Sequence, residues 1–220
     1  MASQTAENYL KAIFYLSKKK EEVNVSELSV VLGVSKPTVN SMIKTLSQQG
    51  MVNHEKYRPL VMTKKGKTAA ALIIRKHRLT EMFLVEKMGF GWEEVHEIAE
   101  QVEHISSKKL FDRMEELLNY PTNDPHGSPI PDRNGTFRKS TFEPLSTFKK
   151  GDRVILKALN DSEKDLLIFL NNKSIELHME FEIIGKESFD DSMEIAFGKN
   201  QRLTLSERVC NNLLVEAITA

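Results

Sequence analysis

Two predicted helices joined by a tight turn restrict the fold of this chain more than any other feature. Apolar residues recur at helical spacing on both sides of Gly33 within residues 25–50, and glycine readily takes the left-handed backbone conformation that ends a helix. Ser26 is placed to cap the first helix, and Ser35 is placed to cap the second. Pro37 stands near the start of the second helix, where an N–H group would have no partner anyway. This arrangement predicts a helix-turn-helix motif.

The second helix of this motif would enter the major groove of DNA with its first turns. Its apolar residues share one face, which we expect to pack into the core: Val39, Met42, Ile43 and Leu46. The opposite face would then meet the bases and phosphates. The predicted DNA-contacting residues of this face are Ser35, Lys36, Pro37, Thr38, Asn40, Ser41 and Lys44.

A predicted wing follows the two helices. Residues 51–55 and 59–63 are expected to form short strands around a basic tip. The tip adds Lys56, Tyr57 and Arg58 to the predicted DNA contacts, because cations at such a tip suit the phosphate backbone. The alternative is that the helices form a packing motif and that the basic residues are only solvated.

Charge and composition narrow the functional class further. Residues 1–80 hold 14 Lys and Arg against 5 Asp and Glu, whereas residues 81–220 hold 17 against 26. A basic front part favours a polyanion, here double-stranded DNA, as the partner. The single cysteine, Cys210, excludes an internal disulfide and a thiolate zinc cage. The longest apolar run, residues 69–74, is far short of the ~18 residues of a membrane span, and no export signal is visible, so we expect no membrane partner and a cytoplasmic location.

The chain changes character at a segment rich in proline and glycine, residues 121–150, which we interpret as a linker or a long ordered crossing loop. Helical periodicity dominates before it, and short strands follow it, which predicts an α+β fold that ends in a small barrel. The expected divisions are a winged helix-turn-helix domain (1–73), a helical metal-binding and dimerisation domain (74–120), the linker, and the barrel (151–220). The expected barrel elements are strands at 153–159, 178–185, 192–197, 201–205 and 213–217, with a helix at 164–170.

Histidine and glutamate residues gather in the second of these divisions. His96, Glu100, Glu103 and His104 would share an arc of about 100° on one helix, because each residue advances a helix by about 100°. On the helix before it, His77 and Glu81 lie one turn apart. Packing of the two helices could bring these six donors together. Imidazole and carboxylate ligands without thiolate favour Mn²⁺, Fe²⁺, Co²⁺ or Zn²⁺.

Several segments of the chain resemble the diphtheria-toxin-repressor family of metal-dependent transcriptional repressors, which has iron-responsive and manganese-responsive branches. The resemblance extends over nearly the whole chain and implies that the barrel is an SH3-like (FeoA-like) domain. The segments that carry it are Ala-Glu-Asn-Tyr-Leu at 6–10, Val-Ser-Lys-Pro-Thr-Val at 34–39, Arg-Lys-His-Arg-Leu-Thr-Glu at 75–81, Val-Glu-His at 102–104 and Gly-Ser-Pro-Ile-Pro at 127–131.

The resemblance also implies how the metal ligands are grouped. An ancillary site would use His77, Glu81 and His96, with Asp161 or Glu163 of the barrel as further candidates. A primary regulatory site would use Glu100, Glu103 and His104, completed by Asn8 of the first helix. The iron-responsive branch has cysteine at position 100, so Glu100 favours Mn²⁺ and leaves Fe²⁺ as the alternative. Lys11 stands where the manganese branch has a ligating glutamate, and an ammonium group cannot ligate.

The function implied by the resemblance is a metal-dependent repressor of metal-homeostasis genes, and no enzyme. It would bind a palindromic operator as a homodimer, with dimer contacts at residues 83–120. Two alternatives stay open: a metal-independent winged-helix regulator that responds to a small molecule, and a His/Glu metalloenzyme. The second is disfavoured because the sequence has no His-Glu-x-x-His motif. The apolar residues expected at the dimer contact, each of which could equally belong to the core, are Phe83, Leu84, Met88, Phe90, Trp92, Ile105, Leu110, Phe111 and Leu117.

Overall fold

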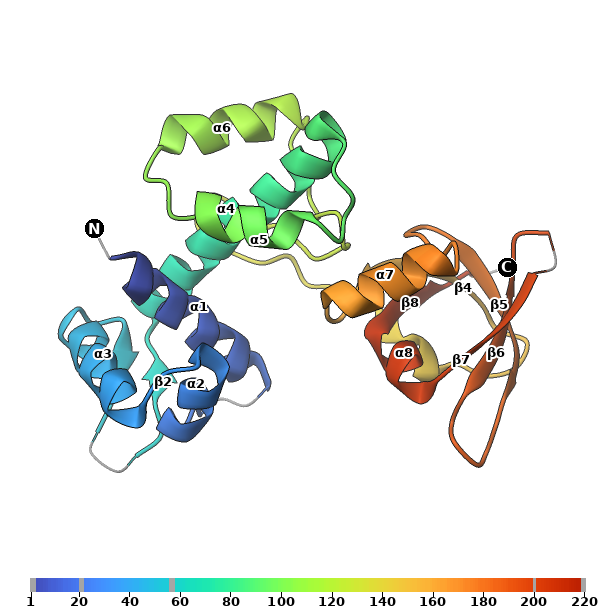
Figure 1. The fold of residues 1–220 in the computed structure, drawn as a ribbon, viewed down its shortest axis with the longest axis horizontal. Coiled ribbons are helices and arrows are strands. Elements are labelled where there is room, and N and C mark those ends of the chain that lie inside the picture. Colours follow the sequence, from blue (N-terminus) through green and yellow to red (C-terminus); the bar gives the residue numbers. More distant parts are fainter. Residues whose placement is uncertain (1–2, 20–21, 56–57, 200, 219–220) are drawn as a thin grey trace. The chain divides into compact units, whose positions relative to one another are not determined.

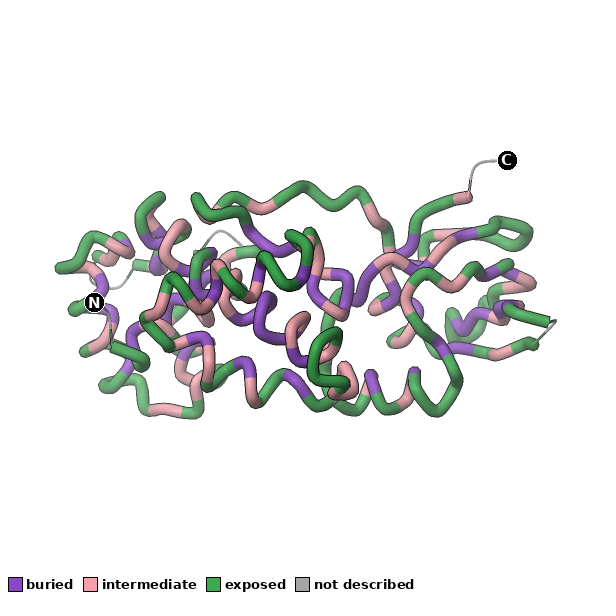
Figure 2. Tube along the Cα trace, turned by 90° about the horizontal axis from the view of Figure 1, so that it is seen from above, coloured by how far each residue is buried: buried purple, intermediate pink, exposed green. Residues whose placement is uncertain are grey.

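The computed structural model describes residues 3–19, 22–55, 58–199 and 201–218, and it confirms the predicted α+β fold (Figure 1). Contacts divide the chain into two units, and buried residues occur throughout both (Figure 2). Among the described residues, no helix combines the length and the apolar character that crossing a bilayer requires. The N-terminal unit comprises Met1–Thr80, Ile98–Tyr120 and Ile130–Arg138, and the C-terminal unit comprises Glu81–Glu97, Pro121–Pro129 and Lys139–Ala220.

The predicted helix-turn-helix is present in the N-terminal unit as α2 and α3. Gly33 ends α2 with a φ of 64°, and the Ser35 side chain caps α3 by accepting a hydrogen bond from the Thr38 N–H group. The prediction that Ser26 caps α2 is wrong. Asn24 caps this helix, because it forms a reciprocal capping box with Glu27. The elements of this part are α1 (Gln4–Lys19), α2 (Val25–Leu32), α3 (Lys36–Gln48), β1 (Val52–Asn53) and β2 (Val61–Met62).

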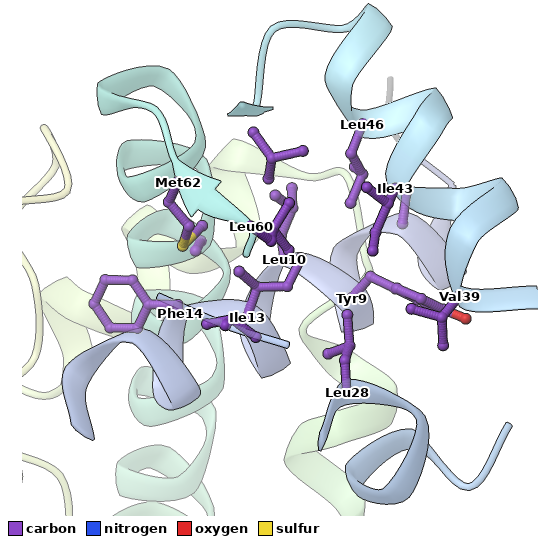
Figure 3. Close-up of a cluster of buried hydrophobic side chains, with 14 of the residues drawn as sticks. Tyr9, Leu10, Ile13, Phe14, Leu28, Val39, Ile43, Leu46, Leu60 and Met62 are labelled. Carbon is purple, nitrogen blue, oxygen red and sulfur yellow. The ribbon is translucent and has the colours of Figure 1, made fainter. Parts of the chain in front are cut away.

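One apolar core holds these elements together, as Figure 3 shows. Leu10 and Ile13 of α1 point into it and are no more than 1% exposed. Of the core-facing residues predicted for α3, Met42 is partly buried against this core and the other three are fully buried within it. The paired strands β1 and β2 close one side. Helix α1 is therefore packed firmly against the helix-turn-helix. The other labelled core residues are Tyr9, Phe14, Leu28, Val39, Ile43, Leu46, Leu60 and Met62.

Three further helices follow the wing: α4 (Lys64–Met88), α5 (Val95–Val102) and α6 (Lys108–Leu117). In the N-terminal unit, the buried Glu115 of α6 pairs with Arg75 of α4 at 2.6 Å and with Arg133 at 2.9 Å. Arg75 also donates a hydrogen bond to the Pro131 carbonyl. Because these contacts hold residues 130–138 within this unit, that part of the proline-rich segment is an ordered crossing loop.

The C-terminal unit contains a six-stranded antiparallel sheet in the order β3-β8-β4-β5-β6-β7. All five predicted strands and the predicted helix are present, whereas β3 and α8 were missed. Trp92 packs against the sheet core, and its Nε1 donates to Asn171 Oδ1 at 2.7 Å, while its place at a dimer contact stays a prediction. The elements are β3 (Glu143–Pro144), η1 (Leu145–Thr147), β4 (Arg153–Leu159), α7 (Lys164–Asn172), β5 (Glu180–Lys186), β6 (Met193–Phe197), β7 (Gln201–Leu205), α8 (Glu207–Asn212) and β8 (Leu213–Ala217).

Candidate metal centre

A completely buried carboxylate, that of Glu103 just after α5, is the centre of one side-chain cluster in the N-terminal unit. Its Oε2 lies 2.6 Å from Nδ1 of His77 on α4, and its Oε1 lies 2.6 Å from Nζ of Lys11 on α1. Burial alone would raise the pKa of Glu103, but the hydrogen bond from His77 and the charge of Lys11 outweigh burial and hold this pKa below its usual value. The carboxylate is therefore ionised at neutral pH.

The first helix reaches this cluster through an acidic side chain. Nδ1 of His104 lies 2.7 Å from Oε2 of Glu7, and its Nε2 lies 3.7 Å from Oε1 of Glu103. Asn8, which the sequence pattern placed among the ligands, is exposed on α1. The sequence reasoning missed Glu7, although an acidic residue directly before Asn8 was a visible signal. Three helices thus contribute nitrogen and oxygen donors near Glu103.

Glu100 lies at the open side of the same cluster. Its side chain is 51% exposed, and its Oε1 lies 3.3 Å from the ammonium of Lys11. Lys11 therefore bridges Glu100 and Glu103. Two of the predicted primary-site carboxylates are gathered around one positive charge.

A second cluster surrounds the buried Glu81 of α4 in the C-terminal unit. Oε1 of Glu81 lies 3.5 Å from Nδ1 of His96 on α5, and Oε2 lies 3.9 Å from Nδ1 of His126. Ligand atoms of Glu81, Asp124 and His126 all lie within 4.8 Å of one another, which is a spacing that a single metal ion can bridge. The sequence reasoning missed Asp124 and His126, because they lie in the segment it treated as a linker.

The loop that carries these two residues is built to fix their positions. Oδ1 of Asp124 accepts hydrogen bonds from the N–H groups of His126 and Ser128, and the Leu159 N–H group at the end of β4 donates to the His126 carbonyl. Gly127 has a φ of 84°, and a Cβ atom there would lie 2.2 Å from the Lys157 carbonyl oxygen. Only glycine therefore allows the loop to approach β4 this closely.

The ring of His126 has a defined orientation. Its Nε2 lies 2.9 Å from the Trp92 carbonyl oxygen, which can only accept, so Nε2 carries the hydrogen. In the neutral ring, Nδ1 then presents a lone pair on the side of Glu81. Such a backbone partner on the far nitrogen is how metal-binding histidines are commonly oriented.

The predicted ligands are divided between the two units of the chain. Glu100, Glu103 and His104 belong to the N-terminal unit, and Glu81 and His96 belong to the other. The remaining candidates are placed as follows. His77 lies one turn before Glu81 on α4, and Asp161 and Glu163 line a pocket of about 370 Å³ together with His96. Glu163 also pairs with Arg208 at 3.0 Å.

The predicted DNA-contacting face of α3 is open to solvent. Val39, Ile43 and Leu46 are fully buried on the opposite face, as predicted. In the wing, Arg58 is exposed and pairs with Glu55 at 3.0 Å, whereas Lys56 and Tyr57 lie outside the described residues. The exposed residues of the α3 face are Ser35, Lys36, Pro37, Thr38, Asn40, Ser41 and Lys44.

Three protein families match successive parts of the chain. Residues 1–60 match the family described as "Iron dependent repressor, N-terminal DNA binding domain", and residues 63–132 match "Iron dependent repressor, metal binding and dimerisation domain". Residues 143–217 match the FeoA domain. The matches follow one another along the chain in the order of the predicted domains.

Characterised relatives are similar to different lengths of the chain. The iron-dependent repressor IdeR of Mycobacterium tuberculosis is 36% identical over 127 residues, which are 58% of this chain and 55% of that protein, so the match spans about half the length of this relative. The regulator MntR of Oceanobacillus iheyensis is 30% identical over 150 residues, which are 68% of this chain and all of that protein. The diphtheria toxin repressor of Corynebacterium diphtheriae is 30% identical over 76% of this chain and 72% of its own length.

Solved structures resemble almost the entire chain. A manganese-dependent transcriptional repressor in complex with manganese superposes with a TM-score of 0.88 at 28% identity and covers 97% of this chain and all of its own. ScaR with bound Zn²⁺ superposes with a TM-score of 0.79 at 28% identity and covers 97% of this chain and 99% of its own.

Proposed function

Because this chain belongs to the diphtheria-toxin-repressor family, we propose that it is a metal-dependent DNA-binding transcriptional repressor that senses Mn²⁺ or Fe²⁺ and controls metal-homeostasis genes. The observation that carries the proposal is the buried, ionised carboxylate of Glu103, which lies among donors from α1, α4 and α5. A site of this kind would link cation binding to α1, the helix against which the DNA-binding elements α2 and α3 are packed. The activity is regulatory and not enzymatic.

The donor chemistry of the two clusters fits the proposed metals. Carboxylate and imidazole groups without thiolate suit Mn²⁺ and Fe²⁺, and Mn²⁺ is favoured by the hard oxygen ligand at position 100. The metal supplies a positive charge that several of these groups bind at once. We assign Glu100, Glu103 and His104 to the regulatory site, with Glu7 or Asn8 as the ligand from α1. We assign His77, Glu81, His96, Asp124 and His126 to the ancillary site, with Asp161 or Glu163 as further candidates.

The mechanism depends on the position of α1. Leu10 and Ile13 anchor this helix in the core of the DNA-binding part, while Glu7 reaches His104. Joining Glu7 and Glu103 through a cation would fix α1, and with it the recognition helix α3, in one orientation. In a homodimer this fixes the spacing of two recognition helices, which must match two half-sites of a palindromic operator.

The proposal is tested by measuring DNA affinity with and without metal. The probe is a palindromic duplex selected in vitro from a random pool by the Mn²⁺-loaded protein. In fluorescence anisotropy, Mn²⁺ is expected to raise the affinity by about 5- to 150-fold over protein treated with chelator, which is the usual range of such couplings. The same duplex is expected to raise Mn²⁺ affinity by the same factor.

A pair of variants locates the effect. Glu103→Ala is expected to abolish the stimulation by Mn²⁺ and to leave a folded dimer, because Glu103 is the central proposed ligand. Glu180→Ala, which removes an exposed carboxylate from the edge of the sheet, is expected to keep the full stimulation. Equal DNA affinity with chelator and with Mn²⁺ would instead support a metal-independent regulator.

A further inference from the structure

Lys11 occupies the place between two carboxylates where the proposed regulatory cation would bind. Its Nζ lies 2.6 Å from Oε1 of Glu103 and 3.3 Å from Oε1 of Glu100, and its side chain is only 13% exposed. An ammonium group donates hydrogen bonds and cannot ligate a metal. Lys11 is therefore a competitor of the metal for the same oxygen, and not a ligand.

The cluster needs a cation when no metal is bound. Glu7 and Glu103 bring two carboxylates to His104, Glu100 adds a third at Lys11, and the carboxylate of Glu103 has no access to water. A buried carboxylate without a partner is strongly unfavourable, so the charge of Lys11 stabilises the metal-free fold. A divalent ion on Oε1 of Glu103 would lie about 2.0 to 2.6 Å from that oxygen. The ammonium cannot stay at its present distance from the same atom, because the two cations would repel each other.

We propose that Lys11 is the resident cation of the metal-free site and that a divalent ion binds by displacing its ammonium group from Glu103. The proposal rests on the proposed function. Displacement makes Lys11 a positioning residue that sets the metal concentration at which the protein responds. A protein that must break the contact between Lys11 and Glu103 binds metal more weakly than one that does not.

The exchange also changes how α1 is held. Glu7 and Lys11 lie one turn apart on α1 and therefore share a face of this helix. Without metal, α1 is joined to the segment just after α5 at two places, through Lys11 and Glu103 and through Glu7 and His104. Displacement of Lys11 would release the first of these contacts and leave the Glu7 end of α1 as the remaining joint. Metal binding would thus remove one of two tethers of this helix.

Calorimetric titration of the full-length protein with Mn²⁺ tests the proposal. Lys11→Met is expected to bind Mn²⁺ about 10- to 100-fold more tightly than the wild type, which corresponds to about 1.4 to 2.8 kcal/mol, the range of a hydrogen bond to a charged group. Lys11→Arg keeps the charge and is expected to stay near the wild-type affinity. Lys18→Met is the matched control, because it removes the same charge from the same helix where Lys18 lies over the rings of Phe14 and Phe137.

The outcomes separate this proposal from the assignment of the site. Unchanged or weaker Mn²⁺ binding by Lys11→Met would overturn the displacement, provided that Glu103→Gln loses binding. Wild-type Mn²⁺ affinity of Glu103→Gln would overturn the site itself and the displacement with it. A merely structural role of Lys11 would weaken binding on substitution, so tighter binding is diagnostic.

A measurement on the wild-type protein needs no substitution. Acetic anhydride modifies accessible uncharged amines, and mass spectrometry reports the labelling of each lysine. Mn²⁺ is expected to raise the labelling of Lys11 severalfold, because its amine leaves Glu103, and to leave the labelling of Lys18 unchanged. Equal labelling of Lys11 with and without Mn²⁺, at a concentration that saturates the calorimetric signal, would overturn the displacement.

Discussion

Replacement of Gly127 by alanine tests whether the loop before β4 positions the ancillary ligands as the structure indicates. An L-residue with a positive φ of this kind costs about 1 to 2 kcal/mol. The added Cβ would in addition lie 2.2 Å from the Lys157 carbonyl oxygen, and forcing the backbone apart costs about 1 to 3 kcal/mol more. The expected loss in the free energy of unfolding is therefore about 2 to 5 kcal/mol, together with a displaced His126.

Gly151→Ala is the control for this experiment. Gly151 has a φ of 90°, close to the 84° of Gly127, but nothing lies within 4 Å of a Cβ atom there. Its substitution is expected to cost only the conformational part, about 1 to 2 kcal/mol. Urea unfolding measures both losses, and calorimetry measures the number of Mn²⁺ ions bound. Equal losses of stability, or an unchanged metal stoichiometry in Gly127→Ala, would refute the reasoning.

Three further substitutions test other parts of the structure. Burial alone would raise the pKa of Glu115, but hydrogen bonds and charge from its two arginine partners lower this pKa on balance. The ionised carboxylate of Glu115 therefore stabilises the fold at a pH above its pKa in the unfolded chain. This stabilisation is lost as the pH falls through its lower pKa in the folded protein. When the free energy of unfolding is measured over this acid pH range, Glu115→Gln is expected to lose less of it than the wild type. Identical pH curves of the two proteins would contradict the assignment. Ser35→Ala is expected to lower the free energy of unfolding by about 1 kcal/mol, since it removes the cap of α3, and chemical denaturation measures this. Asn40→Ala is expected to relax the sequence preference for DNA, as for a base contact. Lys44→Ala is expected to weaken binding to all DNA sequences and to reduce the salt dependence of binding, as for a phosphate contact. Binding assays with selected and scrambled duplexes at several salt concentrations distinguish the two kinds of contact.

The predictions from sequence succeeded where neighbouring residues determine the structure. Gly33 and Ser35 act on the helix ends beside them, so the end of α2 and the start of α3 followed from the sequence. The predicted cap of α2 was wrong for an equally local reason, because Asn24 and Glu27 form a two-way capping box that starts the helix two residues earlier than a cap at Ser26 would.

The predictions failed where distant segments meet. His126 becomes a candidate ligand because its loop packs against β4, and no helical spacing relates it to Glu81. An apolar side chain gives no sign of which surface covers it, so the sequence did not show that Trp92 packs on the sheet core.

The proposed link from metal to DNA depends on one helix, α1, which belongs to two sets of contacts. Leu10 and Ile13 place α1 in the core shared with α2 and α3, and Glu7 and Lys11 place it in the cluster around Glu103. Protein cores are close-packed, so α1 cannot shift against the recognition helix without breaking that core. Under the proposed mechanism, release of Lys11 from Glu103 would therefore act on the helix-turn-helix through this core. A cation bound to carboxylates far from the major groove would in this way control the orientation of α3.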